Sequence, residues 1–134
     1  MKTLDNAWNS QDWDTFHERH ADNVEVFWPG QAGPTRGVQN HREVEFFKMF
    51  PDNHLVNNPY KILIAEGDYT CSVADFTGTF KGAMKGLDGK MIQPTNKKFR
   101  LEFCTVAHWK DGKILEERLF YDQVGMLKQI GVIQ

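Results

Sequence analysis

The segment Lys98–Tyr121, KFRLEFCTVAHWKDGKILEERLFY, is the stretch that best indicates how this chain folds. β-Branched and aromatic residues fill Lys98–Trp109 and Ile114–Tyr121, and the turn residues Asp111 and Gly112 lie between them. Such side chains suit a half-buried pleated surface, and an Asp-Gly pair suits a tight turn. We therefore expect a long β-hairpin at the centre of an antiparallel sheet.

The segments before this hairpin divide into a helical part and a strand-like part. Further strands are expected over Leu55–Ile64 and Tyr69–Phe80, which Gly67-Asp68 separates. Apolar residues at helical spacing predict helices over residues 4–8, Trp13–His20 and Val38–Phe50, with a strand over Asn23–Trp28 and a short last helix over Gln123–Ile130. Helices followed by antiparallel strands predict an α+β fold with the helices on one face of the sheet.

Composition restricts the class of protein. The chain has 134 residues and a net charge of −2, and its basic residues are scattered, which argues against a nucleic-acid or anionic-membrane partner. Its apolar runs are only a few residues long, and its N-terminus lacks a hydrophobic signal region. We expect a single domain over residues 1–134, located in the cytoplasm, with Cys71 and Cys104 as reduced thiols. The 13% content of aromatic residues favours a cavity lined by rings.

An ordered set of short motifs runs along the chain. They are the Trp-Asn-x-x-Asp-Trp break between helices, Phe50-Pro51-Asp52, Glu66-Gly67-Asp68, Thr77-Gly78-Thr79, Pro94-Thr95-Asn96-Lys97, Asp111-Gly112-Lys113-Ile114-x-Glu116, Tyr121-Asp122 and Met126-Leu127-Lys128-Gln129-Ile130-Gly131. In this order and at these spacings they resemble the SnoaL-like polyketide cyclase (ester cyclase) family, within the NTF2-like superfamily. The resemblance extends from about residue 7 to residue 131.

This resemblance implies both a fold and an activity. The implied fold is a cone, in which a curved antiparallel sheet surrounds an apolar pocket that N-terminal helices close. The implied reaction is an intramolecular aldol condensation that closes a ring of an aromatic polyketide ester, with neither a metal nor an organic cofactor. The catalytic acid/base of the family is an aspartate after the last long strand, and Asp122 occupies that position here.

The chemistry of Asp122 has two interpretations. Aldol ring closure needs a proton removed beside one carbonyl and a proton delivered to the oxygen of another, and a carboxyl group with a raised pKa can do both. Leu119, Phe120 and Tyr121 precede Asp122 and suggest such a water-poor environment. Alternatively, Asp122 is the N-cap of the helix over Gln123–Ile130, which is a common role of aspartate.

The turn at Asp111-Gly112 decides which side chains of the hairpin share a face. A two-residue loop would pair Trp109 with Ile114, whereas a three-residue loop would pair His108 with Ile114. We favour the three-residue loop, which also pairs Cys104 with Arg118. One face, which we expect to line the pocket, then carries Glu102, Cys104, Val106, His108, Glu116, Arg118, Phe120 and Asp122.

Several of these side chains are candidate catalytic or binding residues. Arg118 could hold an anionic enolate or ester oxygen, or it could form an ion pair with Glu102 or Glu116. His108 could relay protons, or it could be exposed at the end of the hairpin. Asp75 is a second acid/base candidate if its side chain points inward, although an outward, solvated position is the expected one.

The remaining candidates form the expected wall of the pocket. Trp13, Trp28, Phe46, Phe50 and Phe80 could contact a ligand together with Cys104 and Phe120, although plain core packing explains most aromatic stripes. His41 is either a core histidine or a residue that faces the pocket. Because no carboxylate or cysteine completes a ligand spacing with His17, His20 and His41, no metal site is expected.

Two kinds of function remain open at this stage. The first is a cofactor-independent enzyme, a cyclase, isomerase or dehydratase, that acts by acid/base catalysis on a small hydrophobic carbonyl or ester substrate. The alternative is a non-catalytic module that binds a hydrophobic ligand or serves in dimerisation. We expect a homodimer in either case.

Overall fold

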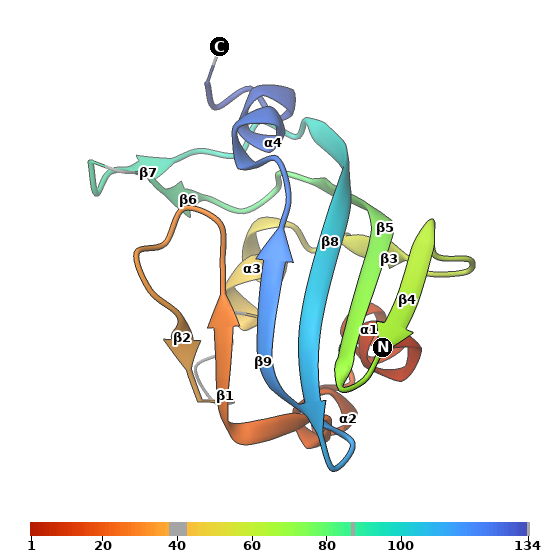
Figure 1. The fold of residues 1–134 in the computed structure, drawn as a ribbon. Coiled ribbons are helices and arrows are strands. Elements are labelled where there is room, and N and C mark those ends of the chain that lie inside the picture. Colours follow the sequence, from red (N-terminus) through yellow and green to blue (C-terminus); the bar gives the residue numbers. More distant parts are fainter. Residues whose placement is uncertain (38–42, 87, 134) are drawn as a thin grey trace.

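The computed structural model describes residues 1–37, 43–86 and 88–133, and a curved sheet dominates it (Figure 1). The helices are α1 (Lys2–Ser10), α2 (Trp13–Glu18), α3 (Glu43–Met49) and α4 (Gln123–Gln129). The strands of the main sheet are β1 (His20–Phe27), β2 (Thr35–Arg36), β3 (His54–Val56), β4 (Ile62–Glu66), β5 (Tyr69–Thr79), β8 (Lys98–Lys110) and β9 (Lys113–Phe120). A separate small hairpin pairs β6 (Met84–Lys85) with β7 (Met91–Ile92).

The sheet has the strand order β2-β1-β9-β8-β5-β3, and β4 also pairs with β5. Its pairs are antiparallel except that β1 runs parallel to β9, where the Ile114 amide donates to the Arg19 carbonyl over 2.8 Å. The α+β prediction is therefore confirmed, although the sheet is mixed rather than wholly antiparallel. The helices α1 and α2 lie at one end of this sheet, and α4 lies at the other (Figure 1).

Several predicted boundaries need correction. The single strand predicted over Leu55–Ile64 is wrong, because Pro59 lacks the amide N–H that a continuous ladder needs and β3 ends before it. The helix predicted to reach His20 ends at Glu18, and β1 begins at His20 itself. Of the helix predicted over Val38–Phe50, residues 38–42 lie outside the described residues. The short strands β2, β6 and β7 were not predicted.

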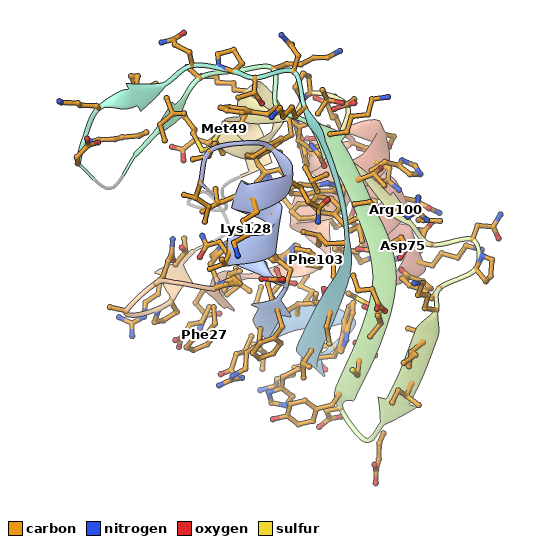
Figure 2. All side chains as sticks on the ribbon, turned by 90° about the horizontal axis from the view of Figure 1, so that it is seen from above. Phe27, Met49, Asp75, Arg100, Phe103 and Lys128 are labelled. Atoms are coloured by element: carbon orange, nitrogen blue, oxygen red, sulfur yellow. The ribbon has the colours of Figure 1, made fainter. Side chains whose placement is uncertain are left out.

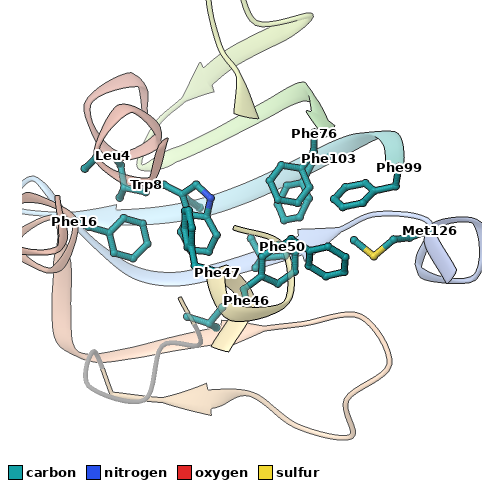
Figure 3. Close-up of a cluster of buried hydrophobic side chains, with 14 of the residues drawn as sticks. Leu4, Trp8, Phe16, Phe46, Phe47, Phe50, Phe76, Phe99, Phe103 and Met126 are labelled. Atoms are coloured by element: carbon teal, nitrogen blue, oxygen red, sulfur yellow. The ribbon is translucent and has the colours of Figure 1, made fainter. Parts of the chain in front are cut away.

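A row of aromatic rings fills the space between the helices and one face of the sheet (Figure 3). Phe46 of α3 packs on Phe50 and on Phe76 of β5, with ring centroids 5.0 and 5.6 Å apart. Phe76 continues the row to Phe99 and Phe103 of β8, at 5.6 and 5.2 Å. Burying each such ring contributes about 1.5–3 kcal/mol, so this row stabilises the packing of α3 on the sheet.

Polar side chains fasten α1 to the segment that contains β3. The Trp8 indole N–H donates to Asn53 Oδ1 over 2.7 Å, and the Asn9 side chain bonds both the carbonyl and the amide of Leu55, at 2.8 and 2.9 Å. The Asn57 side chain donates to Asn6 Oδ1 over 2.8 Å. Because a short helix is marginal alone, these bonds and the burial of Trp8 fix where α1 lies.

The close approach of Gly82 to the end of α3 generates a prediction about stability. A Cβ atom at Gly82 would lie 1.9 Å from the Lys48 carbonyl oxygen, whereas one at Gly33 would meet nothing within 4 Å. Gly82→Ala should therefore lower the free energy of unfolding by about 1–3 kcal/mol, and Gly33→Ala should change it by less than about 0.5 kcal/mol. Urea denaturation followed by tryptophan fluorescence measures both. Equal effects of the two substitutions would contradict the close contact.

Candidate functional site

A wide cleft of about 640 Å³ opens between α3, the β6–β7 hairpin and α4. Its apolar walls come from Trp28, Phe46, Met49, Phe50, Ala83, Met84, Tyr121, Met126 and Leu127, and polar side chains at its margin come from Gln31, Glu45, Lys48, Lys85 and Gln123. A cleft of this size and lining suits a small organic molecule with a large apolar surface.

A second, much smaller cavity of about 50 Å³ lies deeper, beneath α1. It is lined by Met1, Leu4, Asp5, Trp8, Phe16, Trp28, Phe46, Leu55, Phe76, Phe103, Thr105, Glu117 and Leu119. Trp28 and Phe46 line both spaces, so these two rings stand where the cleft and the cavity meet. The fold thus has a large compartment toward α4 and a small one toward α1.

The small cavity is lined by buried carboxyl groups among apolar side chains. Asp5 on α1 is 5% exposed and Glu117 on β9 is 4% exposed. The Tyr60 hydroxyl donates a short hydrogen bond to Asp5 Oδ2, and His20 Nε2 lies 3.2 Å from Glu117 Oε1. His20 is held in turn by the Phe16 carbonyl, 2.7 Å from its Nδ1.

Burial gives Asp5 an unusual acidity. Desolvation raises the pKa of Asp5 to about 6, the hydrogen bond from Tyr60 opposes this rise, and the negative charge of Glu117 adds to it. Desolvation and the neighbouring Asp5 also raise the pKa of Tyr60, so its hydroxyl remains a proton donor. A carboxyl group with a pKa near neutrality can exchange protons at physiological pH, as general acid/base chemistry requires.

Sequence reasoning missed Asp5, Tyr60 and Glu117. Two signals could have found the carboxyl groups. Asp5 lies three residues before Trp8, on the apolar stripe of α1. Glu117 lies two residues before Leu119, so both side chains are on the buried face of β9. No pattern along the chain indicates that Tyr60, which follows β3, reaches α1.

The register of the β8–β9 hairpin combines features of both predicted loops. Asp111 and Gly112 form a two-residue turn with positive φ at both positions, and Trp109 pairs with Ile114. A bulge follows between His108 and Trp109, after which His108 pairs with Glu116 and Cys104 with Phe120. The predicted three-residue loop is therefore wrong.

The bulge keeps Cys104 and His108 of β8 on the same face as Arg118 and Phe120 of β9, as predicted. That face, however, is the outer face of the sheet. Phe103, Thr105 and Leu119 are the neighbours that line the cavity. The expectation that Cys104, His108, Arg118 and Phe120 face the pocket is wrong, because these side chains alternate with the buried ones. Phe120 is 52% exposed, and Cys104 Sγ lies 3.9 Å from Cys71 Sγ.

Charged and polar candidates on the outer face have partners there. Arg118 forms an ion pair with Glu116 and lies over the ring of Phe27, 4.5 Å from its centroid. The His108 ring stacks on Tyr69, with centroids 4.6 Å apart. These contacts match the structural alternative for Arg118, and they leave both side chains away from the cleft and the cavity.

Asp75 also points away from the interior, as its alternation predicted. Its carboxylate binds the Lys61 ammonium over 3.0 Å and forms an ion pair with Arg100. Asp75 lies on β5 and Arg100 lies on the adjacent strand β8 (Figure 2). The hydrogen bond from Lys61 outweighs partial burial and, with Arg100, holds the pKa of Asp75 below its ordinary value. Asp75 is therefore an ion-pair partner on the surface and does not join the buried carboxyl groups of Asp5 and Glu117.

Asp122 caps α4 and is not itself among the described residues that line the cleft. Its side-chain Oδ1 accepts from the Gly125 amide over 2.8 Å, and its residue is exposed. Tyr121 and Gln123, on either side, both line the cleft. The predicted water-poor environment of Asp122 is wrong, because β9 ends before it and the residue is exposed, although both of its chain neighbours line the cleft.

The predicted wall residues divide between site and core. Trp28, Phe46 and Phe50 line the cleft. Trp13 packs on Trp8 and Phe47, with ring centroids 5.8 and 5.4 Å apart, and Phe80 is fully buried against Phe50. Trp13 and Phe80 therefore belong to the core, and His41 lies outside the described residues.

Within the described part of the chain, His, Cys, Asp and Glu form no group of three or more that could hold a metal ion. In the same residues, no helix is long and apolar enough to cross a membrane.

Solved structures place this architecture among the NTF2-like folds. IdmH of Streptomyces antibioticus, a proposed polyketide cyclase, shares 24% identity at a TM-score of 0.77, over 97% of this chain and 94% of that one. A proposed polyketide cyclase from Xanthomonas campestris pv. campestris shares 16% identity at a TM-score of 0.83, over 97% and 93%. TsrD of Streptomyces laurentii shares 19% identity at a TM-score of 0.80, over 99% and 92%.

The sequence model of the SnoaL-like polyketide cyclase family matches residues 1–130, so the chain belongs to that family. Membership supports a cyclase-type function on a small molecule. None of the curated proteins compared with this sequence matches it.

The raised pKa of Asp5 predicts a pH-dependent stability. An acid whose pKa rises from 3.8 to about 6 on folding keeps its proton in the folded state while the unfolded chain releases it. The free energy of unfolding therefore falls, by about 3 kcal/mol, as the pH rises through that interval. Asp5→Asn removes this dependence, so the advantage of the wild type over the variant should shrink by that amount between about pH 4 and 7.

Urea denaturation across this pH range measures the difference. Asn9→Ala is the matched control, because it removes hydrogen bonds between α1 and Leu55 but no titrating group, and its effect should not vary with pH. A constant difference between the wild type and Asp5→Asn would contradict the buried, perturbed carboxyl.

Proposed function

We propose that this protein is a cofactor-independent acid/base enzyme of the polyketide-cyclase type. Its substrate is a small hydrophobic carbonyl or ester compound that binds in the wide cleft. The reaction is an intramolecular aldol condensation or a related isomerisation or dehydration. The observation that supports this proposal most directly is the apolar cleft of about 640 Å³, which shares Trp28 and Phe46 with a small cavity lined by buried carboxyl groups.

The reaction needs few components from the protein. A carbon next to a carbonyl loses its proton to a carboxylate, and the electron pair left behind forms a bond to a second carbonyl carbon. The oxygen of that second carbonyl receives a proton. Asp122 is the carboxylate that family resemblance suggests, and its position between the cleft residues Tyr121 and Gln123 supports this role.

A non-catalytic ligand-binding module is the alternative, because the same cleft would serve it equally well. The predicted homodimer stays a prediction. Ile62, Leu63 and Ile64 of β4 are exposed apolar side chains, with Ile64 61% exposed, and they are available for such a contact.

A charge placed in the cleft should weaken ligand binding. Met84 lines the cleft on β6, whereas Met91, on the paired strand β7, is exposed and does not line it. Met84→Lys should weaken the binding of an aromatic polyketide methyl ester by about tenfold, since a desolvated ammonium costs well over 1 kcal/mol, and Met91→Lys should have little effect. Isothermal titration calorimetry compares the two. Equal losses for both variants would place the ligand elsewhere.

Asp122→Asn tests catalysis separately from folding. Asparagine is as good an N-cap as aspartate, so α4 should stay intact. Loss of the acid/base should reduce turnover by at least about 100-fold, the lower end of general acid/base contributions. The assay follows ring closure of aromatic polyketide methyl esters by absorbance, and circular dichroism checks the fold. An unchanged rate would exclude Asp122 as the acid/base, and binding without turnover in the wild type would favour the binding module.

A further inference from the structure

The small cavity contains a carboxyl group for which the reaction at Asp122 has no use. Asp5 Oδ2 accepts the hydroxyl of Tyr60, and the residue is 5% exposed. A carboxyl group has several hydrogen-bonding sites on its two oxygens, so this one bond leaves it able to bind a further group. Asp5 is one of the residues that line the cavity.

The charged and titratable groups around Asp5 come from several elements. The Met1 amino group interacts with it from the start of the chain, Tyr60 from the segment after β3, and Glu117 from β9. His20 of β1 contacts Glu117 rather than Asp5. The local charges are thus partly balanced, and desolvation remains the largest influence on the acidity of Asp5.

The size and lining of the cavity indicate what it can hold. A volume of about 50 Å³ has room for little more than one water molecule or one small ligand group. Trp8, Phe16 and Phe103 are among its apolar walls, which favour an uncharged group. A carbonyl oxygen, or the hydroxyl of the corresponding enol, has the size, neutrality and hydrogen-bonding capacity that fit this position.

We propose that the small cavity binds the oxygen-bearing end of the hydrophobic substrate and that Asp5 hydrogen-bonds to that oxygen, while the rest of the molecule occupies the cleft beyond Trp28 and Phe46. Protonated Asp5 donates to a carbonyl oxygen. Ionised Asp5 accepts from an enol or phenol hydroxyl. This assignment rests on the proposed function for the class of ligand, and it adds the position and the polar contact.

The two protonation states make opposite predictions for two probes. 2-Acetylnaphthalene presents a carbonyl acceptor, and 2-naphthol presents a hydroxyl donor that stays protonated in the range tested. In the wild type, affinity for the ketone should fall by about tenfold per pH unit above the transition of Asp5, because only the protonated fraction is competent to bind. Affinity for 2-naphthol should instead rise through the same transition and level off. Equilibrium dialysis between about pH 5 and 8 gives both profiles.

Variants assign the pH dependence to Asp5. Asp5→Asn should give flat profiles for both probes. Tyr60→Phe removes the hydrogen bond that lowers the pKa of Asp5, so both transitions should move to higher pH, and this variant keeps the test valid if Asp5→Asn does not fold. Asn9→Ala loosens the same helix by removing its hydrogen bonds to Leu55 and should retain the wild-type profiles.

The result that overturns the inference is a pair of profiles that do not run in opposite directions, or opposite profiles that persist in Asp5→Asn at full strength. Failure of either probe to bind the wild type also overturns it. Asp122→Asn should keep the opposite profiles while losing turnover. If both probes bind with an affinity that does not change with pH while turnover is normal, the role of Asp5 is refuted and the proposed enzyme is not. If the two pH profiles are opposite but no ester is turned over, the proposed enzyme is refuted and the binding site at Asp5 is not.

Discussion

The structure depends on burying one face of the long strands β5, β8 and β9. Their inner side chains, among them Phe76, Phe103 and Leu119, need a cover, and the helices that supply it are short. Large rings from α1 and α3 therefore fill most of the distance between the layers (Figure 3). Because this cover is incomplete toward α4, the same packing leaves a wide cleft beside a tightly filled core.

The position of α1 links this packing to the chemistry of the interior. Hydrogen bonds from Trp8 to Asn53 and from Asn57 to Asn6 hold the helix across the end of the sheet. The apolar stripe of the helix then turns Asp5 toward the cavity, together with Leu4 and Trp8. Stability and acidity are opposed at this point, since the burial that anchors the helix is also what raises the pKa of Asp5. Active sites commonly contain such a conflict between local preference and packing.

Prediction from the sequence succeeded where a pattern is local. The alternation in β8 and β9 located both strands and correctly grouped Cys104 and His108 on one face. It did not show which face is inside, because each face carries apolar side chains, and only the helices decide which is covered. Trp28, Phe46 and Phe50 line the cleft as expected, and of the two roles left open for Arg118 the structure shows the ion pair with Glu116.

The sequence by itself determined the α+β class, the position of the turn at Asp111-Gly112 and the membership of the SnoaL-like family, because each follows from propensity, spacing or motif order along the chain. It gave the wrong loop length at that turn, and it offered the cap at Asp122 as one of two interpretations. The tertiary structure alone decided that Asp5, Tyr60 and Glu117 meet in one cavity. Contacts of this kind join residues that are far apart in the chain, so they depend on how separate elements pack against one another. The acidity of Asp5 depends on the surroundings that this packing creates.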